Sequence, residues 1–221
     1  MKTIAIGDIH GCFDELIELV KIIRKEVEGD KRWVFLGDYV DRGPKIRETV
    51  QYLMEWQWRD DENKIICLKG NHEDMLLKGK MLWLVNGGAQ TIKSYDVPGM
   101  VGIPGEHRKW MDELPVFYID PTCPSRVFVH AGIQRGKTME EQIPVDMMWI
   151  REEFLYNETS DGLYVVHGHT PIMKKLPQVM PTRCNVDTGC CFGGVLSAAV
   201  FDERQYEPYL LFNHQGMKVS R

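Results

Sequence analysis

The stretch L-G-D-Y-V-D-R-G-P, residues 36–44, decides the fold class of this chain. It overlaps an apolar run at 33–36 (W-V-F-L) that is typical of a buried β-strand. Two carboxylates and a guanidinium, those of Asp38, Asp41 and Arg42, therefore occupy the turn where a strand ends. Open α/β sheets carry their chemistry in the loops that follow the carboxyl ends of strands, so these three residues are candidate site residues.

The same succession of strand, polar turn and helix occurs three times in the first third of the chain. The strands are expected at 2–6, 33–36 and 64–68, the turns at 7–11 (G-D-I-H-G), 36–44 and 70–73 (G-N-H-E), and the helices at 13–27, at 44–56 and from 74 onward. Short connections of this kind predict parallel strands joined by right-handed crossovers. All three polar turns should then lie along one edge of one sheet.

The rest of the chain continues the α/β pattern. Residues 81–114 show a weaker helical pattern, which we interpret as a helical elaboration on the core and not as a separate domain. Further strands are expected at 115–119, 126–129 and 163–166, a helix at 145–155, and a terminal hairpin from strands at 195–201 and 206–212. The motifs H-A-G (130–132) and H-G-H-T-P (167–171) follow two of these strands. The sequence thus predicts a single α/β domain over residues 1–221.

Composition limits the class of partner. With 43% hydrophobic and 27% charged residues, the chain resembles an ordinary globular protein. Its net charge of −5 and pI near 5.8 argue against nucleic acid and anionic membranes as partners. The amino terminus has no signal-peptide pattern and the six cysteines form no C-x-x-C pair, so we expect a cytoplasmic protein with reduced thiols. His107 and His214 are expected at the surface, and the oligomeric state stays open.

Side chains that suit divalent metals gather at the ends of five predicted strands. They are Asp8, His10, Asp38, Asn71, His72, His130, His167 and His169. Carboxylate, imidazole and amide groups without thiolate favour Mn, Fe or Zn over a structural cysteine-zinc site. The set is too large for one ion that must also hold water and substrate. Two ions that share one carboxylate, about 3.5–4 Å apart, fit better.

Each motif taken alone has a simpler explanation. The turn D-x-H-G could cap a helix, His130 could be a structural histidine, and Arg151 could be an exposed helix charge. All of these explanations would have to hold together, and the conjunction of motifs therefore favours a metal site.

The motifs G-D-I-H-G, G-D-Y-V-D-R-G, G-N-H-E, H-A-G and G-H-T-P occur in an order and at a spacing that resemble a known family. The resemblance is to the phosphoprotein phosphatase branch of the calcineurin-like metallophosphoesterases, and in particular to small bacterial and phage serine/threonine phosphatases such as that of phage lambda. It runs from about residue 2 to 200. It implies two mixed β-sheets flanked by helices, with the active site at the carboxyl ends of the strands.

Carried over position by position, the resemblance also implies a role for each candidate residue. Two divalent ions are expected, Mn²⁺ first and Fe or Zn as alternatives. Asp8, His10 and Asp38 would bind the first ion, and Asp38, Asn71, His130 and His169 the second. The general acid would be His72 paired with Asp41, and the substrate phosphate would be held by Arg42, Arg151 and Asn71. Glu73 would support its turn through hydrogen bonds and not bind metal. The resemblance does not fix His167, which could support the ligands, face the substrate or be a buried strand histidine, and the roles of Asp187 and Cys190 stay open.

The resemblance implies hydrolysis of phosphate monoesters by direct attack of a metal-bridging hydroxide, with no phosphoenzyme. The cysteines lie in no C-x₅-R loop, which argues against a thiol nucleophile. The expected function is a serine/threonine phosphoprotein phosphatase that acts on a phosphoprotein or a small phosphoester. A dinucleoside polyphosphate hydrolase of the same fold is the main alternative. An inactive binding scaffold is a remote alternative, because every expected ligand position is filled.

Overall fold

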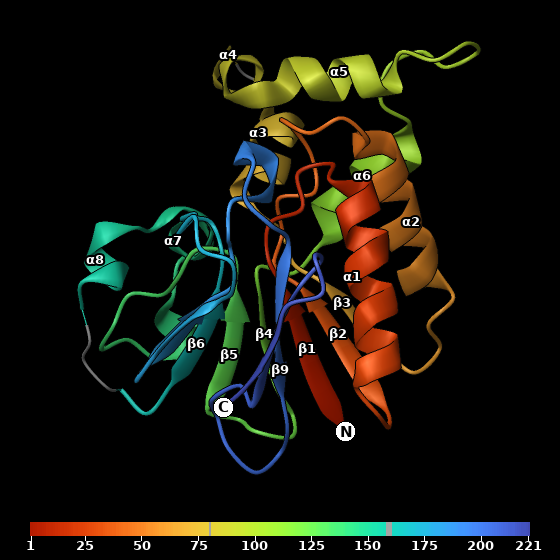
Figure 1. Cartoon of the computed structure of the whole chain (residues 1–221). Coiled ribbons are helices and arrows are strands. Elements are labelled where there is room, and N and C mark those ends of the chain that lie inside the picture. Colours follow the sequence, from red (N-terminus) through yellow and green to blue (C-terminus); the bar gives the residue numbers. More distant parts are fainter. Residues whose placement is uncertain (80, 158–160) are drawn as a thin grey trace.

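We describe the fold from a computed structural model that covers residues 1–79, 81–157 and 161–221. Two β-sheets pack face to face, and helices cover the outer side of each sheet (Figure 1). In spatial order, the first sheet contains β11 (Lys218–Ser220), β10 (Leu210–Asn213), β9 (Ser197–Phe201), β1 (Lys2–Ile6), β2 (Lys31–Phe35) and β3 (Ile65–Cys67). The second contains β4 (Phe117–Ile119), β5 (Arg126–Val129), β6 (Tyr164–His167), β8 (Arg183–Asn185) and β7 (Gln178–Met180). The predicted α/β fold of two mixed sheets flanked by helices is confirmed.

The strands that lead into the polar turns are parallel neighbours. β1 pairs with β2 and β2 with β3, so that Phe35 lies opposite both Ile6 and Cys67. In the second sheet β5 pairs in parallel with β6, and β6 with β8. Antiparallel strands complete both sheets, β9 beside β1 and β4 beside β5. Because parallel strands end at the same edge of a sheet, the polar turns of each sheet gather at one edge.

Alternating side chains divide each strand between two apolar layers. Ile4 and Ile6 of β1 belong to the layer under the helices of the first sheet, whereas Ala5 belongs to the layer between the sheets. In β5, Phe128 lies in the layer between the sheets and Val127 in the layer under the helices of the second sheet. A sheet that is buried on both faces needs apolar residues at successive positions, which explains the continuous apolar runs.

Helices form the outer layers. α1 (Phe13–Glu26) and α2 (Ile46–Trp58) cover the first sheet, and α7 (Pro144–Trp149) and α8 (Glu152–Leu155) cover the second (Figure 1). The buried face of α1 is the predicted one, made of Leu16, Leu19, Val20 and Ile23. The helix predicted at 145–155 is interrupted at Ile150 and Arg151, which separate α7 from α8.

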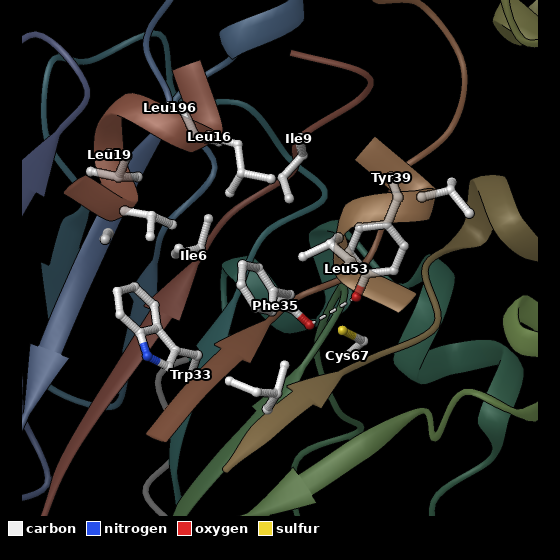
Figure 2. Close-up of a cluster of buried hydrophobic side chains, with 14 of the residues drawn as sticks. Ile6, Ile9, Leu16, Leu19, Trp33, Phe35, Tyr39, Leu53, Cys67 and Leu196 are labelled. Atoms are coloured by element: carbon white, nitrogen blue, oxygen red, sulfur yellow. Dashed lines mark hydrogen bonds between the residues drawn. The ribbon is translucent and has the colours of Figure 1, made fainter. Parts of the chain in front are cut away.

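The apolar core reaches up to the turn at 36–44. Figure 2 shows Tyr39 at this end of the core, near Phe35, Leu53 and Cys67. The Tyr39 hydroxyl lies 3.1 Å from the carbonyl oxygen of Phe35 and 2.7 Å from that of Leu68. The side chain is fully buried, so it anchors the turn to the ends of β2 and β3.

A helical segment covers this end of the molecule. It comprises α3 (Asn71–Lys78), α4 (Met81–Trp83), the π-helical turn η1 (Leu84–Gly88), α5 (Ala89–Tyr95) and α6 (Gly105–Glu113). In Figure 1, α4 and α5 lie across the top of the molecule above α3. Gly87 interrupts the helical geometry with a φ of 111°, and its carbonyl oxygen accepts the N–H of Arg42 at 3.4 Å. A Cβ at this position would lie 2.9 Å from Cγ of Arg42, so the contact requires glycine.

Some details differ from the sequence prediction. His107, which we expected at the surface, is 2% exposed, so that prediction is wrong. Its ring nitrogens lie 2.8 Å from the Tyr95 hydroxyl and 2.8 Å from Oε1 of Gln51, and burial lowers its pKa. His214 is half-buried, and its Nδ1 accepts the N–H of Leu196.

The predicted terminal hairpin is present as β9 and β10, but β11 extends it, and β7 and β8 were not expected. Two short 3₁₀ helices, η2 (Met139–Glu141) and η3 (Cys190–Phe192), complete the elements. Among the described residues, no helix combines the length and the apolar character that a membrane crossing requires.

Candidate metal centre and phosphate site

Glu73 joins the turn at 36–44 to the turn at 70–73. Its carboxylate accepts the backbone N–H groups of Asp38, Tyr39 and Val40 at 2.9, 2.8 and 3.2 Å, and that of Gly70 at 2.9 Å. The residue is fully buried; burial and the charge of Asp38 raise its pKa to about 7. Glu73 therefore holds the backbone of the turns in place, and its oxygens are occupied by these bonds.

Five candidate residues have a left-handed backbone. The φ angles of His10, Asp38, Asp41, Arg42 and His169 are 45°, 55°, 69°, 69° and 66°. Residues other than glycine seldom adopt this backbone conformation, because it is strained for them. Backbone strain of this kind is concentrated at functional sites. These backbone conformations turn the polar side chains of the turns toward one region between them.

Two groups of metal-binding atoms lie in that region, and Asp38 belongs to both. The first group is His10, Asp38 and His72, and the second is Asp38, His130 and His169, all buried. Oδ2 of Asp38 lies 3.3 Å from Nε2 of His10, and Oδ1 lies 3.4 Å from Nε2 of His130. The two oxygens thus face different groups, so the one carboxylate could serve two ions.

Asn71 completes the second group. Its Oδ1 lies 2.9 Å from Nε2 of His130 and 3.0 Å from Nδ1 of His169, and those two nitrogens are 3.1 Å apart. Burial lowers the pKa of His130, and it lowers the pKa of His169 to about 2. Neutral imidazoles keep a lone pair for a metal. The buried Nε2 of His169 has no hydrogen-bond partner within the part of the chain that the structure describes.

Asp8 lies among acidic neighbours. Its two carboxylate oxygens accept the N–H of His169 at 3.2 and 3.1 Å. Burial, followed by the charges of Asp187 and Asp38, raises the pKa of Asp8 well above its usual value. Burial likewise raises the pKa of Asp187 to about 6. A buried cluster of carboxylates is costly unless cations compensate it, so Asp187 belongs to the site environment.

These residues fit divalent cations. Buried carboxylates, imidazoles and an amide oxygen converge, and the buried Nε2 of His169 is left without a hydrogen-bond partner among the described residues. The donor set is consistent with a dinuclear centre and suits Mn, Fe or Zn. The first group contains His72 beside His10 and Asp38 and does not include Asp8, which we predicted as a ligand of the first ion. Asp8 instead accepts the backbone N–H of His169 and lies near other carboxylates.

His72 and Asp41 form a buried pair beside the first group. Nδ1 of His72 lies 2.6 Å from Oδ2 of Asp41, and its Nε2 lies 3.9 Å from Oδ2 of Asp38. The second carboxylate oxygen of Asp41 accepts bonds from Nε1 of Trp83 at 2.8 Å and from the hydroxyl of Thr91 at 2.6 Å. The helical segment therefore positions the pair.

Trp83 and Thr91 were not among the predicted site residues. Both belong to W-L-V-N-G-G-A-Q-T, whose only signal is a pair of hydrogen-bond donors in a segment without a clear amphipathic pattern.

The two candidate phosphate-binding arginines approach the site from different elements. Nη1 of Arg42 lies 2.5 Å from Nε2 of His10, and its guanidinium lies 5.0 Å from the ring centre of Phe192. Nη1 of Arg151 donates to the carbonyl oxygen of His169 at 3.3 Å and to the hydroxyl of Thr170 at 3.1 Å. Each arginine thus touches a candidate metal ligand, and a guanidinium can bind two phosphate oxygens at once.

His167 lies apart from both metal groups. It is fully buried, with Nδ1 3.1 Å from the carbonyl oxygen of Gly168 and Nε2 3.4 Å from Nη1 of Arg183. Burial, followed by the charge of Arg183, lowers its pKa to about 3. Its ring packs edge-on against that of Phe154 in α8, with 5.1 Å between ring centres, and it belongs to neither group of metal-binding atoms.

Comparison with known proteins adds a family match and relatives of similar length. The model of the family "Calcineurin-like phosphoesterase" matches residues 1–207. A bis(5'-nucleosyl)-tetraphosphatase PrpE [asymmetrical] from Geobacillus sp. is 26% identical over 92% of this chain and 91% of its own length. The protein of the same name from Anoxybacillus flavithermus is 29% identical over 90% of both chains.

Solved structures agree on the fold. The cold-active protein-tyrosine phosphatase of a psychrophilic Shewanella species superposes with a TM-score of 0.69 over 99% of this chain and 80% of its own. At 19% identity this likeness shows the fold alone.

Proposed function

The chain belongs to the calcineurin-like phosphoesterase family, and from this premise we propose that it hydrolyses dinucleoside polyphosphates such as diadenosine tetraphosphate. It is a metal-dependent phosphoesterase, and the proposal concerns its substrate. The observation that carries the proposal is the likeness to two tetraphosphatases over about nine tenths of both chains. The comparisons favour this alternative over the phosphoprotein phosphatase that we expected first.

The proposed chemistry assigns three tasks to side chains of the chain. Arg42 and Arg151 hold the oxygens of the reacting phosphoryl group. His72 donates a proton to the leaving oxygen, and Asp41 keeps its ring in the orientation for that donation. Two divalent ions, when bound, supply Lewis acidity and activate water.

The leaving group of an anhydride needs less help than that of an ester. A terminal phosphate ionises with a pKa near 6, so it leaves as a weak base. The alkoxide of serine is a far stronger base and depends more on a proton donor. The pair of His72 and Asp41 can therefore serve both substrate classes, and its geometry alone does not select between them.

A direct competition tests the proposal. The Mn²⁺-loaded protein would be given diadenosine tetraphosphate, a phosphoserine peptide and an aryl phosphate, with nucleotide products separated by chromatography. We expect kcat/KM for the tetraphosphate to exceed that for the peptide at least tenfold, with products of unequal phosphate number, as the name of the relatives states. Asp38→Asn, which should abolish activity on every substrate and is prepared in parallel, controls for a contaminating hydrolase. A clear preference for the peptide would reject the proposal and restore the phosphoprotein phosphatase.

A further inference from the structure

A pocket opens beside the candidate site. It has a volume of about 390 Å³. Its lining residues are Arg42, Gly43, Pro44, Gln90, Lys93 and Ser94. Arg42 belongs to this lining and also contacts His10 of the first metal group, so one side chain connects the pocket with the candidate metal centre. This volume is within the range of pockets that bind small molecules.

The walls of the pocket suit an anion. Two of its side chains, those of Arg42 and Lys93, are cationic, and none of the described residues that line it is acidic. Gln90 offers an amide donor and Ser94 a hydroxyl donor. The whole chain has a net charge of −5, so this concentration of donors and positive charge is local.

Two contacts fix the wall that carries Lys93. The carbonyl oxygen of Gly87 accepts the N–H of Arg42, and the hydroxyl oxygen of Ser94 accepts the N–H of Arg47 at 3.0 Å. The first contact joins the helical segment to the turn at 36–44, and the second joins it to α2, which follows that turn. The spacing between Arg42 and the wall formed by α5 is therefore set by the fold.

We propose that this pocket binds the phosphate groups of a nucleoside polyphosphate that lie beyond the reacting one, with Lys93 as the principal contact. The inference rests on the proposed function, because only a polyphosphate extends past the reacting phosphoryl group. Arg42 would contact the reacting group and its neighbour, and Lys93 the groups further along. A single phosphate monoester would leave the pocket empty, so the pocket distinguishes substrates by the length of the phosphate chain.

Inhibition by inorganic phosphates tests the pocket without a nucleotide. The Mn²⁺-loaded protein would hydrolyse an aryl phosphate while tripolyphosphate or orthophosphate is added at a constant excess of metal. All variants experience the same chelation, so differences between them reflect the protein. Lys93→Ala should raise the inhibition constant of tripolyphosphate about tenfold, and more than that of orthophosphate. Gln90→Glu, which adds a negative charge to the wall, should act in the same direction.

Lys109→Ala is the matched control. Lys109 is an exposed lysine of the same helical segment, is 3.8 Å from Glu113, and does not line the pocket. Its variant should keep the inhibition constant of tripolyphosphate within twofold of that of the unmodified protein. An unchanged constant for Lys93→Ala, or equal weakening of tripolyphosphate and orthophosphate, would overturn the inference.

The two proposals can fail separately. If the protein does not cleave diadenosine tetraphosphate but tripolyphosphate inhibition still depends on Lys93, the pocket stands and the nucleotide substrate falls. If the tetraphosphate is cleaved and Lys93 has no effect on tripolyphosphate inhibition, the proposed function stands and the pocket falls.

Discussion

Nδ1 of His72 lies 2.6 Å from Oδ2 of Asp41, in a place where both side chains are buried. The bond fixes the imidazole so that its other nitrogen faces Asp38, 3.9 Å away. This orientation is what a proton donor beside the candidate metal centre requires.

Replacement of His72 tests this role. His72→Asn should lower kcat for a phosphoserine peptide about 100-fold or more, because the leaving alkoxide loses its proton donor. The loss should be smaller for an anhydride substrate, whose leaving group is a weaker base. Metal content, measured by mass spectrometry, should change far less than turnover. Unchanged turnover on the peptide would remove His72 from the acid role.

The tryptophan that supports Asp41 is a second target. Trp83→Phe removes the N–H that bonds Oδ1 of Asp41 at 2.8 Å but keeps most of the apolar ring. We expect kcat to fall several-fold with KM nearly unchanged, and the free energy of unfolding to fall by about 1–3 kcal/mol. Trp110→Phe is the matched control, because Trp110 donates to Gln57 and has no contact with Asp41. Equal effects of both substitutions on kcat would mean that Trp83 is merely structural.

Asp38 is the carboxylate that both metal groups share. Asp38→Asn should abolish activity and remove bound metal, since the amide carries no charge and presents only one oxygen. Metal per protein chain after dialysis is the measurement. If the variant kept two ions per chain, Asp38 would not be the shared ligand.

The contact between the helical segment and Arg42 can be tested at Gly87. Gly87→Ala should destabilise the protein by about 1–3 kcal/mol, because a side chain is strained at this φ and meets Arg42. The affinity for substrate should fall as well, since Arg42 must move. Gly99→Ala is the control: Gly99 also has a positive φ, but among the described residues nothing lies within 4 Å of its Cβ position. An equal effect of both variants on KM would exclude a specific role for the contact.

The loss of protein stability at acid pH should depend on Asp120. This carboxylate lies 2.7 Å from Nη1 of the fully buried Arg126. Burial alone would raise the pKa of Asp120, but bonds from Thr122 and the charge of Arg126 outweigh it and hold the pKa below its usual value of 3.8. The folded state thus binds its proton less readily than the unfolded state, so the stability from Asp120 is present above pH 3.8 and is lost as the pH falls through its folded pKa.

Asp120→Asn should therefore lower the free energy of unfolding at neutral pH by about 3 kcal/mol or more. It should also flatten the decline of stability in acid, measured by urea unfolding from pH 7 down to about pH 2, below the unfolded pKa of 3.8. Asp30→Asn, which affects a surface pair with Lys64, should have a much smaller effect. If the stability of Asp120→Asn fell in acid as steeply as that of the unmodified protein, Asp120 would not be the group responsible.

The parts of the fold that follow a strong periodic pattern could be predicted from the sequence. β1 and the start of α1 match their predicted positions, because apolar residues recur there with a clear period. β7, β8 and β11 have three residues each and lie among polar residues, whereas the equally short β3 and β4 lie within longer apolar runs at 64–68 and 115–119. His107 illustrates a different limit, since its partner Gln51 is 56 residues away and no local signal announces that contact.

The candidate site shows the same division. Residues in the polar turns, such as Asp38 and His130, could be found because each follows a strand, and parallel pairing brings strand ends together. Trp83 and Thr91 could not be placed, because their contact with Asp41 depends on how a kinked helical segment folds back over the turn. Long-range contacts of this kind are set by tertiary packing and leave no periodic trace in the sequence.

The bonds from the backbone of His169 to the carboxylate of Asp8 join residues that are 161 positions apart. The candidate ligands therefore come together only when both sheets have formed and packed, and the unfolded chain offers no comparable site. An ion that binds the folded chain but not the unfolded chain stabilises the folded state. The free energy of unfolding rises by about 2.7 kcal/mol when the free concentration of the ion is 100 times its dissociation constant. The concentration of free metal then affects the stability of the protein as well as its catalysis. Removal of the metal by a chelator would lower the melting temperature without any change of sequence.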